Sequence, residues 1–241
     1  MKNRWLIGVA CILVGVFYAQ AAIITDDFST AGDPLPGNWF QYSSTGTNFV
    51  SNGSYASIKQ AKGDPNAVAW NTGLETISGG GTNFDLSVDV SVHSGGRLTG
   101  VAFNVQNATN YYFVGIVIGG SSYRFYEVVD GTGTQLFAAN ASVVFSDQNK
   151  TNYTINVTSD TEGSYDFFIT EKGQSTVLNS TTNYTVSGTA LSGGYAGLYT
   201  HGNSSEFRYD NFSLETIPEP ATLGMVGLAA AGIIMMRRLR M

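Results

Sequence analysis

Apolar residues recur at every second position through much of residues 23–215, and this spacing limits the fold more than any other feature. In residues 84–92, for example, Phe, Leu and Val alternate with Asp and Ser. Successive side chains point to opposite faces of a β-strand, so the alternation predicts strands with one buried face. No stretch before Pro220 has the three-to-four-residue spacing of a convincing amphipathic helix.

Short glycine-containing segments separate the predicted strands. Gly119-Gly120, Asp130-Gly131 and Lys172-Gly173 each lie between two alternating runs and are typical of hairpin turns. The chain contains 29 glycines and only 12% charged residues, a composition that suits tight turns better than helices. Many short strands with regular turns predict an all-β sandwich or barrel.

Most of the negative charge lies between residues 22 and 217, where 7 basic and 17 acidic residues give a formal charge of −10. A body this acidic repels phosphate backbones, so we expect no nucleic acid among its partners. The one cysteine, Cys11, precedes this segment. We therefore expect neither a disulfide framework nor thiolate chemistry in the body.

The N-terminus has the three parts of a secretory signal peptide. Lys2 and Arg4 supply positive charge, residues 5–18 form an apolar run, and Ala19-Gln20-Ala21 offers the small residues that signal peptidase reads. We expect cleavage after Ala21, which leaves Ala22 as the first residue of the mature protein. An uncleaved membrane anchor is the alternative, but the short apolar run and the Ala-x-Ala site argue against it.

The C-terminus combines a proline-containing triplet, an apolar run and an arginine cluster. In order these are Pro218, Glu219 and Pro220, residues 221–236, and Arg237, Arg238 and Arg240. The prolines keep the triplet extended and open to a protease. A helix over the apolar run would be about 24 Å long, and snorkelling arginines would extend it toward the hydrocarbon thickness. We expect a transmembrane helix with the arginines in the cytoplasm.

From Pro218 onward this pattern resembles the PEP-CTERM sorting signal. The resemblance implies recognition and cleavage by an exosortase. It further implies release from the membrane and sorting to the cell surface or to an extracellular polysaccharide matrix. Together with the leader, the tail indicates an exported protein that is membrane-anchored before processing.

The body carries a second recognisable pattern near its two ends. Its parts are Asp26-Asp27-Phe28-Ser29, Trp39-Phe40, Gly194-Tyr195-Ala196-Gly197-Leu198-Tyr199 and Phe207-Arg208-Tyr209-Asp210-Asn211-Phe212. With these segments the body resembles the concanavalin A-like lectin/glucanase jelly roll, which implies an antiparallel β-sandwich whose first and last strands lie near each other. The predicted organisation is a signal peptide over residues 1–21, a β-sandwich domain over 22–216 and a sorting tail over 217–241.

Glucanases of this superfamily carry Glu-x-Asp-x-x-Glu or Glu-x-Asp-x-Glu on one strand face, where the acids act about 5 Å apart. The sequence has neither spacing. Asp85 and Asp89 share a face, but without a third acid we expect them to be solvated. His93 and His201 lack partners at metal-ligand spacing. We therefore predict no catalytic residue; a site assembled from distant residues is the alternative.

Sugar binding relies on exposed aromatic rings beside hydrogen-bonding groups. The candidate rings are Trp39, Trp70, Tyr111, Tyr112, Tyr123 and Tyr126. The competing interpretation, which we favour, is that most of these rings pack in the core or against neighbouring strands.

Asp27 and Asp210 are candidate calcium ligands, because the resemblance brings the terminal strands together and sandwiches of this superfamily often hold calcium. A pair of simply hydrated acids is the alternative. We expect no other cofactor.

Three functions fit the sequence. The first is a non-catalytic surface or matrix protein, processed by signal peptidase and an exosortase, with a structural or weak polysaccharide-binding role. The second is a hydrolase or lyase acting on extracellular glycans, and the third is a structural filler without a ligand. Carboxylates clustered in a groove would favour the enzyme, whereas neutral polar and aromatic residues would favour binding.

Replacing Pro218, Glu219 and Pro220 with alanine removes the recognition segment and keeps the apolar span. We expect the altered protein to stay membrane-bound and longer than the parent. Cell fractionation with immunoblotting measures both properties. A variant that is released and trimmed like the parent would contradict the sorting hypothesis.

Overall fold

The computed structural model describes part of the chain, and the fold is built from those residues. They are 22–43, 46–59, 67–75, 83–94, 98–141, 144–145, 152–161, 163–187, 191, 193–202 and 206–217. All of them belong to one compact unit. The predicted signal peptide, the proline-containing triplet and the predicted transmembrane helix lie outside the described residues. Within the described ranges, no helix is long and apolar enough to cross a membrane.

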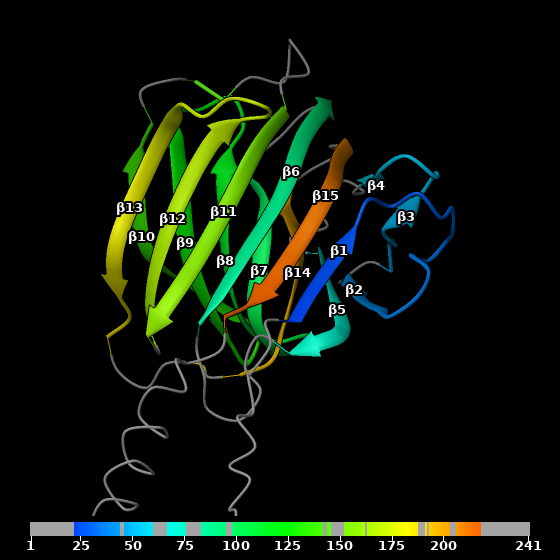
Figure 1. Cartoon of the computed structure of the whole chain (residues 1–241), viewed down its shortest axis with the longest axis horizontal. Coiled ribbons are helices and arrows are strands. Elements are labelled where there is room, and N and C mark those ends of the chain that lie inside the picture. Colours follow the sequence, from blue (N-terminus) through cyan, green and yellow to red (C-terminus); the bar gives the residue numbers. More distant parts are fainter. Residues whose placement is uncertain are drawn as a thin grey trace, which may run out of the picture. The chain divides into compact units, whose positions relative to one another are not determined.

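Two antiparallel β-sheets, called A and B here, stack as two layers (Figure 1). Sheet A has the order β13 (Val177–Thr185), β12 (Ser164–Glu171), β11 (Asn152–Thr161), β6 (Phe84–Ser94), β15 (Glu206–Thr216), β4 (Ala56–Lys59) and β3 (Val50–Ser51), and β1 (Ala22–Asp26) also pairs with β15. Sheet B has the order β10 (Thr132–Asn140), β9 (Ser122–Val129), β8 (Asn110–Val117), β7 (Leu98–Asn107), β14 (Tyr195–His201), β5 (Ala67–Glu75) and β2 (Trp39–Ser43). The predicted all-β antiparallel sandwich is confirmed.

The predicted hairpin turns join strands that are neighbours in a sheet. Asp130 and Gly131 connect β9 to β10 with φ angles of 49° and 77°, and a two-residue type I′ turn requires positive φ at both positions. Gly119-Gly120 lies between β8 and β9, and Lys172-Gly173 lies between β12 and β13. Local turn chemistry therefore sets these three pairings.

The first and last strands pair, as the resemblance implied. Ile24 on β1 lies opposite Leu214 on β15. The Trp39 ring packs nearby, with its centroid 5.1 Å from that of Phe212, and its indole N–H donates to Asp26 Oδ2 over 2.7 Å. Trp39 and its contacts thus fasten the chain's first segment to its last strand.

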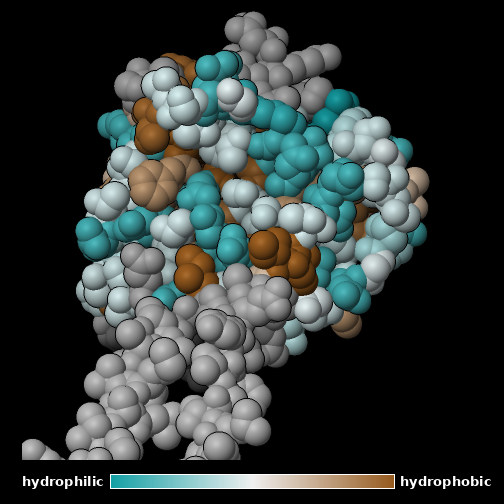
Figure 2. Space-filling model, viewed as in Figure 1, coloured by the Kyte–Doolittle hydropathy of each residue, from teal (hydrophilic) through white to brown (hydrophobic). Residues whose placement is uncertain are grey.

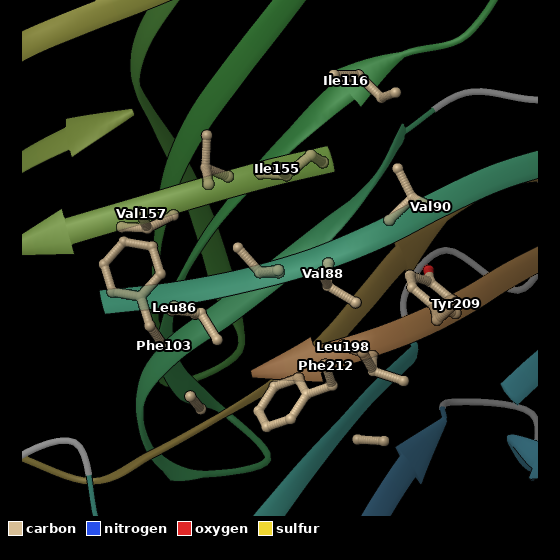
Figure 3. Packing of buried hydrophobic residues seen from close by; sticks show 14 of the residues in the cluster. Leu86, Val88, Val90, Phe103, Ile116, Ile155, Val157, Leu198, Tyr209 and Phe212 are labelled. Atoms are coloured by element: carbon tan, nitrogen blue, oxygen red, sulfur yellow. The ribbon is translucent and has the colours of Figure 1, made fainter. Parts of the chain in front are cut away.

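The inner faces of the two sheets share one apolar core (Figure 3). Sheet A contributes Leu86, Val88 and Val90 from β6 and Ile155 and Val157 from β11, and sheet B contributes Phe103, Ile116 and Leu198. The Phe103 ring lies between 5.0 and 6.5 Å from five other rings, those of Phe84, Tyr112, Phe125, Tyr165 and Phe167. The core is therefore built around aromatic rings.

Phe103→Ala should lower the free energy of unfolding by about 3–5 kcal/mol, because it removes a fully buried ring and leaves a cavity among its neighbours. Urea unfolding measures the change. Phe40→Ala is the matched control in the same sheet, since its ring is 61% exposed, and it should cost about 1 kcal/mol or less. Equal losses for the two variants would contradict this core.

Candidate functional site

The outer face of sheet A is polar, and its polar groups bond across strands. Asn156 Nδ2 donates to Asp85 Oδ1 over 2.6 Å, and the Thr154 hydroxyl donates to Asp89 Oδ1 over 2.6 Å. Figure 2, drawn from this side, shows mostly hydrophilic residues with a few apolar ones among them. A hydrated face of this kind offers little apolar surface for a ligand.

The outer face of sheet B is apolar, and it carries a second cluster separate from the core. Its buried members are Val68, Leu98, Ala102, Val105, Tyr111, Phe113, Val128 and Tyr199, with Trp70, Val117, Tyr126 and Tyr195 partly buried beside them. We call this set the outer apolar face. It exists because β7, β8, β9 and β14 carry large apolar residues in both phases of the strand alternation. All the described strands belong to the two sheets, so none of them forms a further layer over this face, which makes it a candidate binding surface.

Three rings of the outer apolar face form a ring stack across the sheet. Phe113 on β8 lies opposite Tyr126 on β9, with ring centroids 4.8 Å apart and planes 11° apart. Tyr199 on β14 lies on the other side of β7, and its ring centroid is 3.6 Å from that of Phe113. Tyr199 and Phe113 are only 2% and 3% exposed, whereas Tyr126 at the end of the stack is partly exposed.

Two glycines lie side by side in the middle of the face. Gly100 on β7 pairs with Gly115 on β8, and their row ends in Tyr199 on one side and Arg124 on the other. A Cβ at Gly100 would come within 1.9 Å of Val114 O, and one at Gly115 would come within 2.6 Å of Thr99 O. Only glycine permits this close approach, so no side chain rises from the row between Tyr199 and Arg124.

These features enclose a groove of about 500 Å³. Its lining residues are Leu98, Phe113, Val117, Arg124, Tyr126, Val128, Gly133, Tyr199 and His201. The volume falls within the range of small-molecule sites. The described lining residues carry aromatic, aliphatic and cationic side chains, and none of them is a carboxylate.

An exposed pair of rings lies at the edge of the same sheet. Phe40 on edge strand β2 is opposite Trp70 on β5, with ring centroids 6.1 Å apart and planes 18° apart. Phe40 is 61% exposed, and Tyr42 on the same strand is 42% exposed. Phe40 pairs with Trp70 and Tyr42 pairs with Val68, so both rings lie on the outer face of sheet B. Aromatic surface therefore continues from the outer apolar face to the edge strand β2.

The structure divides the six candidate rings between the two faces of sheet B. Trp70, Tyr111 and Tyr126 lie on its outer face, where Tyr111 is only 2% exposed. Trp39, Tyr112 and Tyr123 belong to the core instead. These three rings and Tyr111 are all buried, so none of the four offers a sugar an exposed ring face.

The hydroxyl groups of the inner tyrosines have internal partners. Tyr112 Oη accepts the Leu191 N–H over 2.8 Å and donates to Glu127 Oε1 over 3.2 Å. The Tyr123 hydroxyl bonds to the Thr181 hydroxyl on sheet A. Strand phase explains this placement, because both tyrosines alternate with outward-facing residues of the same strands.

The two candidate calcium ligands have separate partners. Asp27 Oδ1 accepts the Ser29 N–H over 3.0 Å, and hydrogen bonds with Ser29 lower the pKa of that carboxyl. Asp210 lies 3.1 Å from the Lys172 ammonium, which also lies 3.0 Å from Asp89. The ammonium occupies the position beside Asp210 that a cation would need. The described residues hold no group of three or more acids, histidines or cysteines that could bind a metal, so this pair does not fit calcium.

Sequence reasoning missed Phe113, Arg124 and Tyr199. The signal that could have found the two rings is apolar residues in both phases of one strand. Residues 111–118 read Tyr-Tyr-Phe-Val-Gly-Ile-Val-Ile, which is typical of a strand buried on both faces. Arg124 carries no such signal, because an isolated arginine within a strand is usually solvated.

The C-terminal tail matches the family model described as the PEP-CTERM protein-sorting motif, over residues 216–240. The chain therefore carries this motif, which indicates an exported, surface-directed protein. No curated protein matches the chain.

Among solved structures, the chain is similar to the carbohydrate binding module CBM66 from Bacillus subtilis, with 12% sequence identity and a TM-score of 0.54. The alignment covers 74% of this chain and 96% of that module. It is also similar to the VIP36 exoplasmic/lumenal domain in its metal-free form, with 12% sequence identity and a TM-score of 0.56. The alignment covers 82% of this chain and 92% of that domain. The Ca2+/Man2-bound form of that domain has 12% sequence identity to this chain and a TM-score of 0.56. The alignment covers 82% of this chain and 88% of that form. These likenesses show the lectin-like fold.

Burial raises the pKa of the Tyr199 phenol well above its ordinary value, and nearby tyrosines add to the rise. Burial also raises the pKa of Tyr111, and it raises that of Tyr112 to about 12. An apolar surrounding opposes the charged phenolate, so these groups stay protonated where a free tyrosine ionises.

We therefore expect the free energy of unfolding to fall as the pH rises above about 10, where unfolded tyrosines ionise. Above that pH the unfolded state has lost protons that the folded state keeps. Each such group then lowers the free energy of unfolding by up to about 1.4 kcal/mol per pH unit. Urea unfolding at about pH 9 and pH 11 measures the effect. Tyr111→Phe and Tyr199→Phe should each reduce the difference. Equal stability at both pH values would show that these phenols are not desolvated.

Proposed function

We propose that this protein is a non-catalytic, exported surface or matrix protein whose sandwich binds polysaccharide on the outer apolar face of sheet B. Processing at the PEP-CTERM tail is part of the proposal. The observation that carries the binding role is the groove of about 500 Å³, because aromatic rings line it and none of its described lining residues is a carboxylate.

Tyr126 is the ring best placed to contact a sugar. One of its faces packs on Phe113, and its hydroxyl donates to Gln135 Oε1 over 3.0 Å, which fixes the ring. On the neighbouring strand β10, Gly133 lies opposite Val128, and nothing lies within 4 Å of where a Cβ would stand. Space is therefore open beside the end of the ring stack. The C–H face of a pyranose can pack there while its hydroxyls bond to polar groups.

A glycosidase needs two carboxylates about 5–5.5 Å apart, or about 6.5–9.5 Å apart, on either side of the scissile bond. Within the part of the chain that the structure describes, no residue lining the groove supplies one. The closely spaced acids Asp89 and Asp210 lie on sheet A, where Lys172 bridges them. No described feature favours the hydrolase or lyase.

The comparisons support the proposal from two directions. The sorting motif over residues 216–240 indicates a surface destination, where polysaccharides are abundant. The similar solved structures include a carbohydrate binding module and a domain solved with bound Man2. Their fold is shared, and the role they suggest is proposed here for the outer apolar face.

Tyr126→Ala should weaken polysaccharide binding about tenfold or more, equivalent to about 1.4 kcal/mol, because it removes the end of the ring stack. Tyr126→Phe should keep most of the affinity, since the ring remains. Affinity electrophoresis through gels containing a panel of glycans measures binding, and a product assay runs alongside.

Tyr55→Ala is the matched control, because the Tyr55 ring packs 4.4 Å from the guanidinium carbon of Arg208 and away from the groove. It should bind like the parent. Equal weakening by Tyr55→Ala and Tyr126→Ala would place the site elsewhere. Released oligosaccharides would overturn the non-catalytic role, and no retardation by any glycan would overturn the binding role.

A further inference from the structure

We propose that the groove selects an acidic glycan, in which the carboxylate of a uronic sugar pairs with Arg124 while the sugar ring stacks on Tyr126. This inference rests on the proposed function of the groove as a polysaccharide site. Beyond that function, the ligand is assigned to one chemical class, and Arg124 is the residue that recognises it.

The first observation is that Arg124 has no acidic partner among the described residues. The other lysine and arginine side chains whose contacts are described are neutralised: Lys172 lies between Asp89 and Asp210, and Arg208 lies 2.7 Å from Glu206. Arg124 instead makes a single hydrogen bond of 3.5 Å, to the Tyr126 hydroxyl. Its guanidinium keeps most of its donors available for a ligand.

The second observation is that Arg124 lines the groove next to a pair of glycines, which contribute no side chains of their own. Arg124 lies opposite Gly115, which in turn lies opposite Gly100. A Cβ at either glycine would collide with the neighbouring strand, so no side chain of either residue comes between the guanidinium and the groove. The planar fork of an arginine suits a carboxylate, which it can bind through two parallel hydrogen bonds.

The third observation is the contrast between the groove and the body. Residues 22–217 carry a formal charge of −10, yet none of the described residues that line the groove is a carboxylate. Partial burial strengthens a charge-assisted hydrogen bond there, whereas distant surface acids are screened beyond about 8 Å at physiological salt. Arg124 therefore gives the groove a place at which an anion can gain a favourable contact. The acidic body meanwhile opposes densely charged polyanions in general.

The spacing of the two contact residues fits one sugar unit. Arg124 and Tyr126 are two residues apart on β9, so they share a face and lie about 6.7 Å apart along the strand. A uronic sugar carries its carboxylate on the carbon next to the ring oxygen. The ring and the carboxylate can therefore reach the tyrosine and the arginine together.

The test compares polygalacturonate with its methyl ester, which keeps the same backbone but removes the charge. Isothermal titration uses the full chain in a non-ionic detergent. The parent should bind polygalacturonate about tenfold or more tightly than the ester. Arg124→Gln should remove this preference by weakening binding of polygalacturonate far more than binding of the ester, because the cationic guanidinium that pairs with a carboxylate is lost. Tyr126→Ala should weaken binding of both glycans.

Arg208→Gln is the matched control, because it removes an arginine that is already paired with Glu206. It should keep the preference of the parent, and urea unfolding checks that both glutamine variants are folded. Equal binding of the two glycans by the parent, or an unchanged preference in Arg124→Gln, would overturn the inference and leave the proposed function standing. Dextran sulfate bound as tightly as polygalacturonate would overturn the selection of a carboxylate. No binding of any glycan would overturn the proposed function as well.

Discussion

The alternation of side chains along each strand is the constraint on which the other features depend. In sheet B, Tyr112 and Phe125 fill the space between the sheets, and the same geometry turns their neighbours Phe113 and Tyr126 to the opposite face. Neither residue can be moved inward without moving its neighbour out. The core and the outer apolar face are thus two consequences of one set of strands.

Close approach of strands shapes that outer face. Gly100 and Gly115 bring β7 and β8 close together and add no side chains of their own between Tyr199 and Arg124. A single larger residue in this row would collide with the neighbouring strand. The two glycines thus set the strand spacing beneath the outer apolar face, and Phe113, Tyr126 and Tyr199 supply the rings that line the groove.

The two outer faces of the sandwich differ in how far their polar and charged groups are satisfied. On sheet A, Lys172 is shared by Asp89 and Asp210, and Asn211 also donates to Asp89 over 2.8 Å. On sheet B, a ring stack ends in partly exposed Tyr126, and Arg124 lacks a described acidic partner. Because these groups on sheet A bond to one another, its outer face has few hydrogen-bonding groups left for a ligand. The second face keeps apolar surface and hydrogen-bond donors that only an external group can use.

The sequence by itself determined the all-β class, because the period-two pattern and the Asp130-Gly131 turn act locally. It also determined the C-terminal sorting motif, since the order of residues alone defines it. Only the tertiary structure decided which aromatic rings face outward, since Tyr111 and Tyr112 are adjacent and chemically identical. Tertiary contacts likewise gave Asp210 a lysine partner and left Arg124, beside the groove, without an acidic partner among the described residues. The physical reason is that strand phase and cross-strand register bring together residues far apart in sequence, and no local pattern contains that information.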